Sequence, residues 1–236
     1  DDCLYAAGNS TVDRTGCPDR DGDGTSDFND GWTSNNPNFA VDVSVPQNYD
    51  FISVDHSPDG ELIASTDENG YLRIWNATSG INTLSLNVGG YLAGVSWSGD
   101  GMYIGVTKDD DTANVYYASN LSSVHGSIDA DVGGGDYTED IVLSNDGEMA
   151  AIAIGRSGNG GTSGVVRVIN MSDGSVIQNA NPGGEDRFQS VDFSPSGTHI
   201  LVGSSGDFYV VETSTWSTVR SDSSPNADVN AVRWSP

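Results

Sequence analysis

A short turn with the pattern Ser-x-x-Gly recurs along this chain and constrains its fold more than any other feature. It stands at residues 57–60, 98–101, 144–147 and 194–197, and a fifth copy begins at Trp234-Ser235-Pro236. The serines are 41, 46, 50 and 41 residues apart. A repeat of this length is typical of four-stranded sheets that follow one another along a chain.

Each repeat contains segments suited to four strands. The predicted inner strands precede the turns, at 51–55, 93–97, 140–143, 190–193 and 230–234, and the second strands follow the turns, at 62–66, 103–107, 149–154 and 199–203. The predicted third strands are 71–75, 113–117, 165–169 and 208–211. Outer strands close each repeat, for example 83–86 and 176–179. Many of their residues are β-branched or small, which suits a sheet buried on both sides. The chain shows no convincing helical periodicity. We therefore expect an all-β fold, a β-propeller of four-stranded antiparallel blades.

The predicted organisation is an irregular N-terminal segment, 1–37, followed by the propeller, 38–236. Four blades are expected near 49–86, 87–127, 128–180 and 181–222, and the first strand of a fifth at 228–236. A sheet with one strand is incomplete, so the ring is either part of a longer protein or completed by strands of another chain. The alternating segment 39–45 is a candidate to pair with the last blade or with a neighbouring subunit.

One repeat carries a family resemblance. Tyr71-Leu72-Arg73-Ile74-Trp75-Asn76 through Gly80 resembles the third strand and following turn of a WD40 repeat, with Asn where Asp usually follows Trp. The other repeats depart from it with Tyr116-Tyr117, Ile169-Asn170 and Val211-Glu212, and no Gly-His dipeptide begins a blade. The resemblance covers roughly 49–236 and implies a WD40-like propeller, a scaffold whose loops set its partners.

The sharpest chemical motif precedes the propeller. In the twelve residues 19–30, carboxylates occupy the first, third, fifth, ninth and twelfth places and Gly24 the sixth, the spacing of a calcium loop. The predicted Ca²⁺ ligands are Asp19, Asp21, Asp23, Thr25 through its carbonyl, Asp27 and Asp30. Asp30 replaces the usual Glu and no helix pattern flanks the loop, which with Cys17-Pro18 before it resembles thrombospondin type 3 calcium repeats. The alternative is a solvated acidic turn.

Two further features suit an exported protein. Cys3 and Cys17 are the two cysteines, and if paired they close a loop beside the calcium motif; free thiols or metal ligation are the alternatives. Four sequons, at Asn9, Asn76, Asn120 and Asn170, are possible glycosylation sites. Three of them follow predicted third strands, where Asn also forms turns without any sugar.

The charge excludes some partners. With 9 basic and 34 acidic residues the formal net charge is −25, and such a field repels nucleic acid and anionic membrane. The charge leads us to expect a secreted or cell-surface protein of a marine or halophilic microorganism. No apolar run is long enough to span a membrane. The predicted loops carry acidic residues that form a solvated rim or recruit cations or a basic partner: Asp67, Glu68, Asp109, Asp110, Asp111, Asp129, Asp131, Asp136, Glu139, Glu185 and Asp186.

No catalytic residues are predicted. His56, His125 and His199 lie in separate repeats, and the Gly-rich stretches lack a P-loop lysine. The favoured function is a non-enzymatic adhesion or assembly protein that binds another protein, a surface glycan or its own copies through a propeller face or the open blade edge. One version is a filament or sheath subunit that uses strand complementation. The alternative is a secreted polysaccharide hydrolase or lyase with a site in an acidic channel.

Overall fold

The computed structural model describes residues 50–130, 136–156, 164–185, 187–222 and 228–235. The predicted calcium loop, the cysteines, Asn9 and the segment 39–45 all lie outside these residues. Internal contacts divide the chain into two units. One, Asn48–Ile74 with Thr83–Pro236, holds nearly all the described residues and is the unit considered below; Trp75–Asn82 is assigned to the other.

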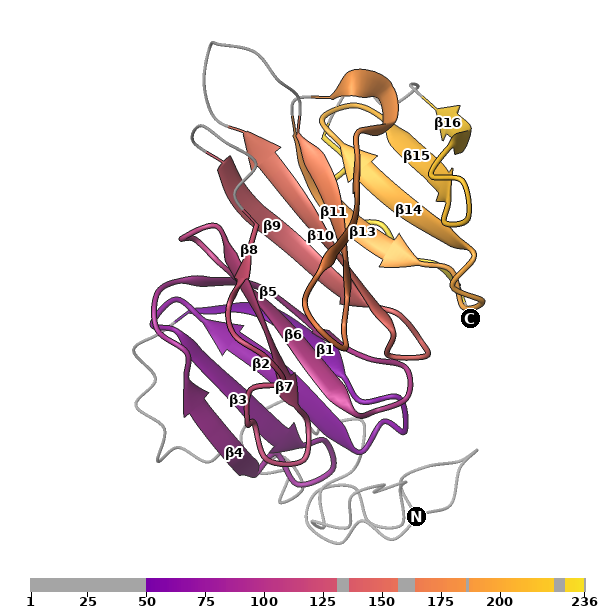
Figure 1. Ribbon diagram of the computed structural model, residues 1–236. Coiled ribbons are helices and arrows are strands. Elements are labelled where there is room, and N and C mark those ends of the chain that lie inside the picture. The colour runs from indigo at the N-terminus through magenta and orange to yellow at the C-terminus, as the bar shows by residue number, and fades with distance from the viewer. Residues whose placement is uncertain (1–49, 131–135, 157–163, 186, 223–227, 236) are drawn as a thin grey trace, which may run out of the picture. The chain divides into compact units, whose positions relative to one another are not determined.

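The described chain forms four antiparallel sheets of four strands each (Figure 1), which we call blades I to IV. Blade I contains β1 (Phe51–His56), β2 (Leu62–Asp67), β3 (Tyr71–Asn76) and β4 (Asn82–Asn87); blade II contains β5 (Leu92–Trp97), β6 (Tyr103–Lys108), β7 (Thr112–Tyr117) and β8 (Ile128–Asp129). Blade III contains β9 (Asp136–Leu143), β10 (Met149–Arg156), β11 (Val165–Asn170) and β12 (Val176–Ala180); blade IV contains β13 (Phe188–Phe193), β14 (His199–Ser204), β15 (Phe208–Glu212) and β16 (Thr218–Asp222). A short 3₁₀ helix, η1 (Pro182–Gly184), precedes blade IV. The predicted four-stranded blades are confirmed.

The Ser-x-x-Gly turn is a small hydrogen-bond network between the first two strands of a blade. In blade I the Ser57 hydroxyl donates to Asp59 Oδ1 at 2.5 Å and accepts from the Leu62 amide at 2.9 Å. Ser98 and Ser144 make the matching pairs of bonds in blades II and III. The glycine that ends the blade I turn, Gly60, has a φ of +74°, which side chains rarely adopt. These requirements explain why the motif recurs.

The core lies between successive blades. Three apolar clusters join blade I to II, II to III and III to IV, and each draws side chains from both sheets. Figure 1 shows the sheets following one another in chain order, from indigo to yellow. We call the contact between two successive blades a joint. In each joint the inner strands are neighbours: β1 contacts β5, β5 contacts β9, and β9 contacts β13. A blade is therefore buried on a face only where another blade packs against that face.

Segment 228–235 departs from the prediction. Residues 230–234 were expected to form a fifth inner strand, and they pair with no strand among the described residues. The reason is physical, because an inner strand is defined by its ladder to the second strand of the same blade. The segment is instead held against blade IV by bonds described below.

Candidate interaction surface

Side chains of one inner strand hold the backbone of the next. Ser53 Oγ accepts from the Val95 amide at 3.3 Å, and Asp55 Oδ2 accepts from the Trp97 amide at 2.6 Å. These residues of β1 thus join blade I to blade II. Because side chains alternate along a strand, two residues at alternate positions point to the same neighbour. We call such a residue a joint acceptor.

The next two joints each keep one of these acceptors. Ser96 Oγ of β5 accepts from the Leu143 amide at 3.1 Å. Asp140 Oδ2 of β9 lies 2.9 Å from Ser190 Oγ and 3.2 Å from the Val191 amide, both of which donate to it. The position that corresponds to Asp140 in blade II is Gly94, where an added Cβ would lie 3.3 Å from the Asp140 Cα. Close approach of the backbones replaces the side-chain bond there.

Segment 228–235 continues the series. Ser190 Oγ accepts from the Val232 amide at 3.2 Å and Asp192 Oδ2 from the Trp234 amide at 2.6 Å. The Val229 amide also donates to the Ser204 carbonyl at 2.9 Å. The segment therefore occupies the place of an inner strand beside blade IV without belonging to a sheet among the described residues.

The opposite end of the series is exposed. Phe51 and Val54 of β1 are 50% and 65% exposed. The same β-bulge interrupts the inner strand of blades I, II and IV, which fixes their equivalent positions. At the Phe51 position Leu92 and Phe188 are fully buried, and at the Val54 position Val95 and Val191 are 2% and 0% exposed. We call Phe51, Val54 and the exposed His56 the β1 surface; among the described residues no blade covers this face as blades I and III cover its equivalents in blades II and IV.

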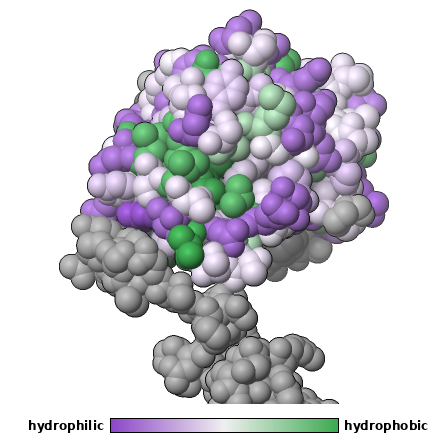
Figure 2. Space-filling model, turned by 90° about the horizontal axis from the view of Figure 1, so that it is seen from below, coloured by the Kyte–Doolittle hydropathy of each residue, from purple (hydrophilic) through white to green (hydrophobic). Residues whose placement is uncertain are grey.

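Exposed apolar residues also occur away from the β1 surface, but, among the described residues, not on another inner strand. Large exposed apolar side chains also occur on the outer strands, including Val176 and Ile177 of β12 and Val219 of β16. Figure 2 shows, from below, a patch of apolar side chains set among polar ones. Exposed apolar area that is gathered in one place is typical of interaction sites.

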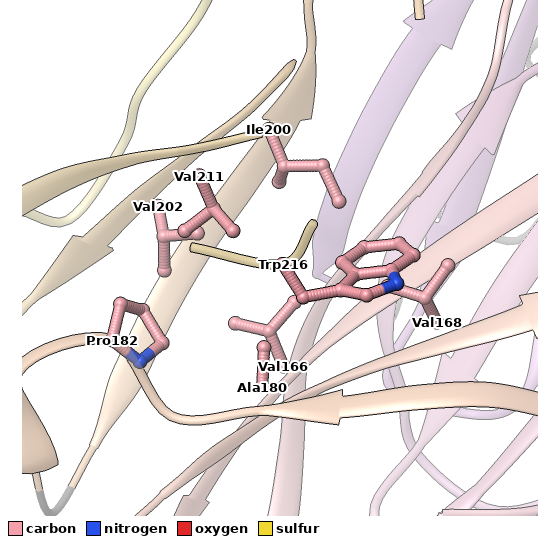
Figure 3. A pocket seen from close by; sticks show the side chains of 8 residues that line it. All are labelled: Val166, Val168, Ala180, Pro182, Ile200, Val202, Val211 and Trp216. Atoms are coloured by element: carbon pink, nitrogen blue, oxygen red, sulfur yellow. The ribbon is translucent and has the colours of Figure 1, made fainter. Parts of the chain in front are cut away.

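The joint between blades III and IV contains an apolar crevice (Figure 3). Its lining residues are Val166, Val168, Ala180, Pro182, Ile200, Val202, Val211 and Trp216. The crevice is too narrow for a water molecule. Trp216 packs against the apolar core between blades III and IV. The crevice is therefore part of the packing between blades.

Burial perturbs the carboxylates of the last two joints. Burial raises the pKa of Asp140 above its ordinary value, while Arg233, whose Nη1 lies 3.6 Å from Asp140 Oδ2, opposes the rise. Burial likewise raises the pKa of Asp192, and the Trp234 amide opposes it. Both carboxylates are bonded within the joints, so the geometry gives them a structural role.

Other charged groups also brace the blades. Arg187 ahead of blade IV donates to Glu139 Oε1 of blade III from Nε at 2.8 Å and from Nη2 at 2.5 Å. Asp67, expected in a solvated acidic rim, is instead buried and paired with Arg73. That expectation is wrong for Asp67, because the Asn69 and Tyr71 amides and the Arg73 guanidinium together replace its water.

A buried phenol ties η1 to blade IV. The Tyr209 hydroxyl lies 2.7 Å from Glu185 Oε1 and 2.9 Å from Asp207 Oδ2. Burial and these two acceptors raise the pKa of Tyr209. Gly183, with a φ of +78°, lies against this hydroxyl and leaves no room for a Cβ.

Among the described sequons, Asn76 and Asn170 end the third strands β3 and β11, and Asn120 lies in the turn after β7. Asn76 Oδ1 accepts from the Thr78 and Ser79 amides, Asn170 Oδ1 from the Ser172 amide, and Asn120 Oδ1 from the Ser122 amide. These are the turn contacts that Asn makes without a sugar. Occupancy by glycans stays a prediction.

The remaining candidate residues are not gathered in the structure. His56, His125 and His199 lie on β1, in the β7–β8 connection and on β14. Among the described residues, no group of three or more His, Cys, Asp or Glu side chains is placed to hold a metal ion. None of the described helices is long and apolar enough to cross a membrane.

The joint acceptors were missed from the sequence, although a signal exists. Ser53-Val54-Asp55 and Ser190-Val191-Asp192 repeat the same three residues ahead of the turn. A polar side chain at two alternate positions of an otherwise apolar inner strand suggests a partner inside the core. Which backbone amide it meets depends on the packing of two blades and is not visible in one repeat.

Comparison with known proteins supports the same fold. A family model described as WD domain, G-beta repeat matches residues 44–76. No curated protein sequence matches. Among solved structures, hydrazine synthase from Kuenenia stuttgartiensis is similar at a TM-score of 0.61 and 16% identity, over 72% of this chain and 48% of that one. The β-propeller domain of Cps50 (Swd1) from Myceliophteria thermophila is similar at a TM-score of 0.62 and 12% identity, over 77% of this chain and 61% of that one.

These likenesses show the fold and no more. The chain spans about half of the first structure's length and about three fifths of the second's. One of the two is named as an enzyme and the other as a propeller domain, so the fold does not decide between catalysis and binding. The four-stranded blades and these structural neighbours together show that the described chain has a β-propeller fold, in which one segment, residues 44–76, matches a WD-repeat model.

Proposed function

We propose that this chain is a non-enzymatic extracellular or cell-surface scaffold that binds other protein through the β1 surface. The observation that carries the proposal is the exposure of Phe51 and Val54, at positions that are buried in blades II and IV. Covering an apolar residue of this size is worth about 1.5 to 3 kcal/mol, so a partner that packs here gains affinity. WD40-like propellers serve widely as scaffolds for protein contacts, which supports a binding role.

The location and the calcium site belong to the same proposal. The net charge of −25, the cysteine pair and the sequons support an exported protein. In this proposal Ca²⁺ is bound by the loop 19–30 and stiffens the N-terminal segment ahead of the propeller. The charge disfavours nucleic acid as a partner, while a surface glycan stays a second ligand class to test.

Photo-crosslinking tests the binding role. A benzophenone amino acid replaces Val54 in the full chain, and a matched variant carries it at Val176, which is 49% exposed on β12. Exposed to the cell-envelope fraction of the producing organism, the Val54 variant should give a discrete crosslinked protein band, and the Val176 variant should not. Equal labelling from both positions, or none from Val54, contradicts the proposal.

Calorimetry tests the calcium site separately. The full chain is titrated with CaCl₂ beside the Asp21→Asn and Asp23→Asn variants, with Asp173→Asn, an exposed turn residue of blade III, as the control. The proposal expects binding by the wild type and the control and a loss of at least about tenfold in affinity in the loop variants. Equal affinities in all four proteins contradict it. Assays for polysaccharide turnover test the alternative enzyme, which no contact described above favours.

A further inference from the structure

Two tyrosines of blade II lie directly opposite each other on neighbouring strands. Tyr103 of β6 pairs with Tyr117 of β7. The Tyr103 amide donates to Ser98 Oγ at 2.9 Å and the Tyr117 amide to the Ser122 carbonyl at 2.9 Å, so neither amide is directed at the opposite strand. The two residues therefore form a non-hydrogen-bonded pair, the kind in which opposite side chains of an antiparallel ladder come closest.

The two phenol rings are in contact. Their centroids are 5.6 Å apart and their planes are tilted by 39°. Aromatic rings that touch have centroids about 4.5 to 7 Å apart. Tyr103 is also held by blade III, because a Cβ added at Gly147 would lie 3.2 Å from the Tyr103 Cδ2. Tyr117 is 38% exposed, so the pair is accessible from solvent.

Other tyrosines of the described chain are less suited to one-electron oxidation followed by coupling. Tyr116 and Tyr209 are only 7% and 6% exposed. Tyr71 and Tyr137 each lie under an arginine guanidinium, 4.6 and 5.2 Å from the ring centroid. A positive charge over a ring opposes the removal of an electron from that ring. Contact with a second phenol and access from solvent thus coincide at Tyr103 and Tyr117.

We infer that Tyr103 and Tyr117 are a modification site, at which hydrogen peroxide and a haem peroxidase couple the two side chains to dityrosine. The peroxidase removes one electron and one phenolic proton from each tyrosine. The two phenoxyl radicals join through one ring carbon ortho to each oxygen, and the hydrogen that each of these carbons carried moves to the oxygen. In total one C–C bond replaces two C–H bonds, and one hydrogen peroxide is reduced to two water molecules.

The coupling joins two strands of one copy rather than two copies. Groups held in contact react at an effective molarity far above the concentration of any second copy. Two copies, each with a formal net charge of −25, also repel one another at low ionic strength. The product ties β6 to β7 covalently and so braces blade II. This role goes beyond the proposed binding function and does not depend on the β1 surface.

The single lysine of the chain provides a direct assay. Lys108 lies between Tyr103 and Tyr117, and both cysteines precede it. The full chain is treated with hydrogen peroxide and a haem peroxidase at low ionic strength, and the monomer is isolated and cut in urea with a lysine-specific protease. An unmodified chain separates into fragments 1–108 and 109–236 on a denaturing gel, whereas in a crosslinked chain the two fragments stay joined. Dityrosine fluorescence, and a mass two hydrogens below the sum of the two fragments, identify the bond.

Matched variants locate the bond. The fragments of the oxidised wild type should stay joined, whereas those of Tyr103→Phe and Tyr117→Phe should separate and lack dityrosine fluorescence. Tyr91→Phe, which changes a 40% exposed tyrosine directly ahead of β5, should behave as the wild type does. Peroxide without peroxidase controls for oxidation of the exposed Met102 and should leave the fragments separate. Circular dichroism confirms that each variant is folded.

Three results overturn the inference. The first is that the oxidised wild-type monomer separates completely into its two fragments. The second is that the fragments of Tyr103→Phe or Tyr117→Phe stay joined to the same extent as those of the wild type. The third is that dityrosine forms only in multimers, because coupling then occurs between copies and not within the pair.

Discussion

Blades I and IV begin with nearly the same six residues but place them in different environments. Ser53–Pro58 and Ser190–Pro195 differ only in His56 and Phe193. Val54 is 65% exposed on β1, whereas Val191, its counterpart on β13, is fully buried under blade III. The motif gives a strand an apolar side chain suited to burial, but that side chain is buried only where a neighbouring blade packs against it.

The same comparison separates two roles of the motif. In both blades the side chains of the Ser-x-Asp pair accept hydrogen bonds from two backbone amides of the element that follows in the chain. The valine between the pair is buried only where another blade precedes the strand. An inner strand therefore has residues that contact both the following and the preceding blade, and among the described residues β1 has no preceding blade to contact.

A buried charge should produce the largest contrast between the two strands. Val191→Asp places a carboxylate in the core between blades III and IV and should lower the free energy of unfolding by about 4 kcal/mol or more. Val54→Asp, on the exposed strand, should change it by no more than about 0.5 kcal/mol. Urea unfolding followed by tryptophan fluorescence measures both. Equal losses would show that the β1 surface is covered in solution.

Loss of a joint acceptor should produce the next contrast. Asp55→Ala leaves the buried Trp97 amide without its acceptor and should cost about 1 to 3 kcal/mol. Asp192→Ala removes the acceptor of the Trp234 amide, which is only half-buried, and should cost less than about 1 kcal/mol. Hydrogen exchange should show faster exchange of the Trp97 and Trp234 amides respectively. A larger loss from Asp192→Ala would mean that segment 228–235 is integral to the fold.

Replacing the turn serines of blades I and IV should give a smaller difference in unfolding free energy. Ser57 is bonded to Asp59 and to the Leu62 amide at 2.5 and 2.9 Å, whereas Ser194 is bonded to Ser196 and to the His199 amide at 3.3 and 3.1 Å. Ser57→Ala should therefore cost about 1 to 2 kcal/mol and Ser194→Ala about 1 kcal/mol or less. Thermal unfolding of the two variants, compared with Ser214→Ala in an exposed turn, checks the order.

Two carboxylates of blade III should respond to pH in opposite directions. Burial raises the pKa of Asp140, so its contribution to stability is complete below the ordinary Asp value and is lost as the pH rises through the raised value. The hydrogen bond from Ser144 lowers the pKa of Asp146, so its contribution is present above the ordinary value and is lost as the pH falls through the lowered one.

The measurement is the unfolding free energy as a function of pH for the wild type, Asp140→Asn and Asp146→Asn. The difference between the wild type and Asp140→Asn should decline as the pH rises from about 4, and the difference for Asp146→Asn should decline as the pH falls below about 4. Arg233→Ala should extend the Asp140 window to higher pH, since Arg233 opposes the rise. Parallel curves for all variants would contradict these assignments.

Much of the fold was predictable because its signals are local. The Ser-x-x-Gly turn is built within six residues, and the strands on either side of it follow from apolar and β-branched composition. An outer strand was expected in every blade, but the bounds of β8 and β16 were not predicted, because these two strands are short or fully exposed and carry little apolar signal. The segment 230–234, expected as a fifth inner strand, pairs with no strand among the described residues, although its amides bond to blade IV.

The candidate surface was not predictable in the same way. The sequence by itself determined the repeat, the turn network and the apolar pattern of each strand, since these depend on residues close along the chain. Only the tertiary structure decided which patterned strands are buried, because burial requires a second sheet that is 40 to 50 residues away. It also decided that Asp55 and Asp192 accept amides from the next element, that Asp67 lies inside with Arg73, and that Phe51 and Val54 remain exposed.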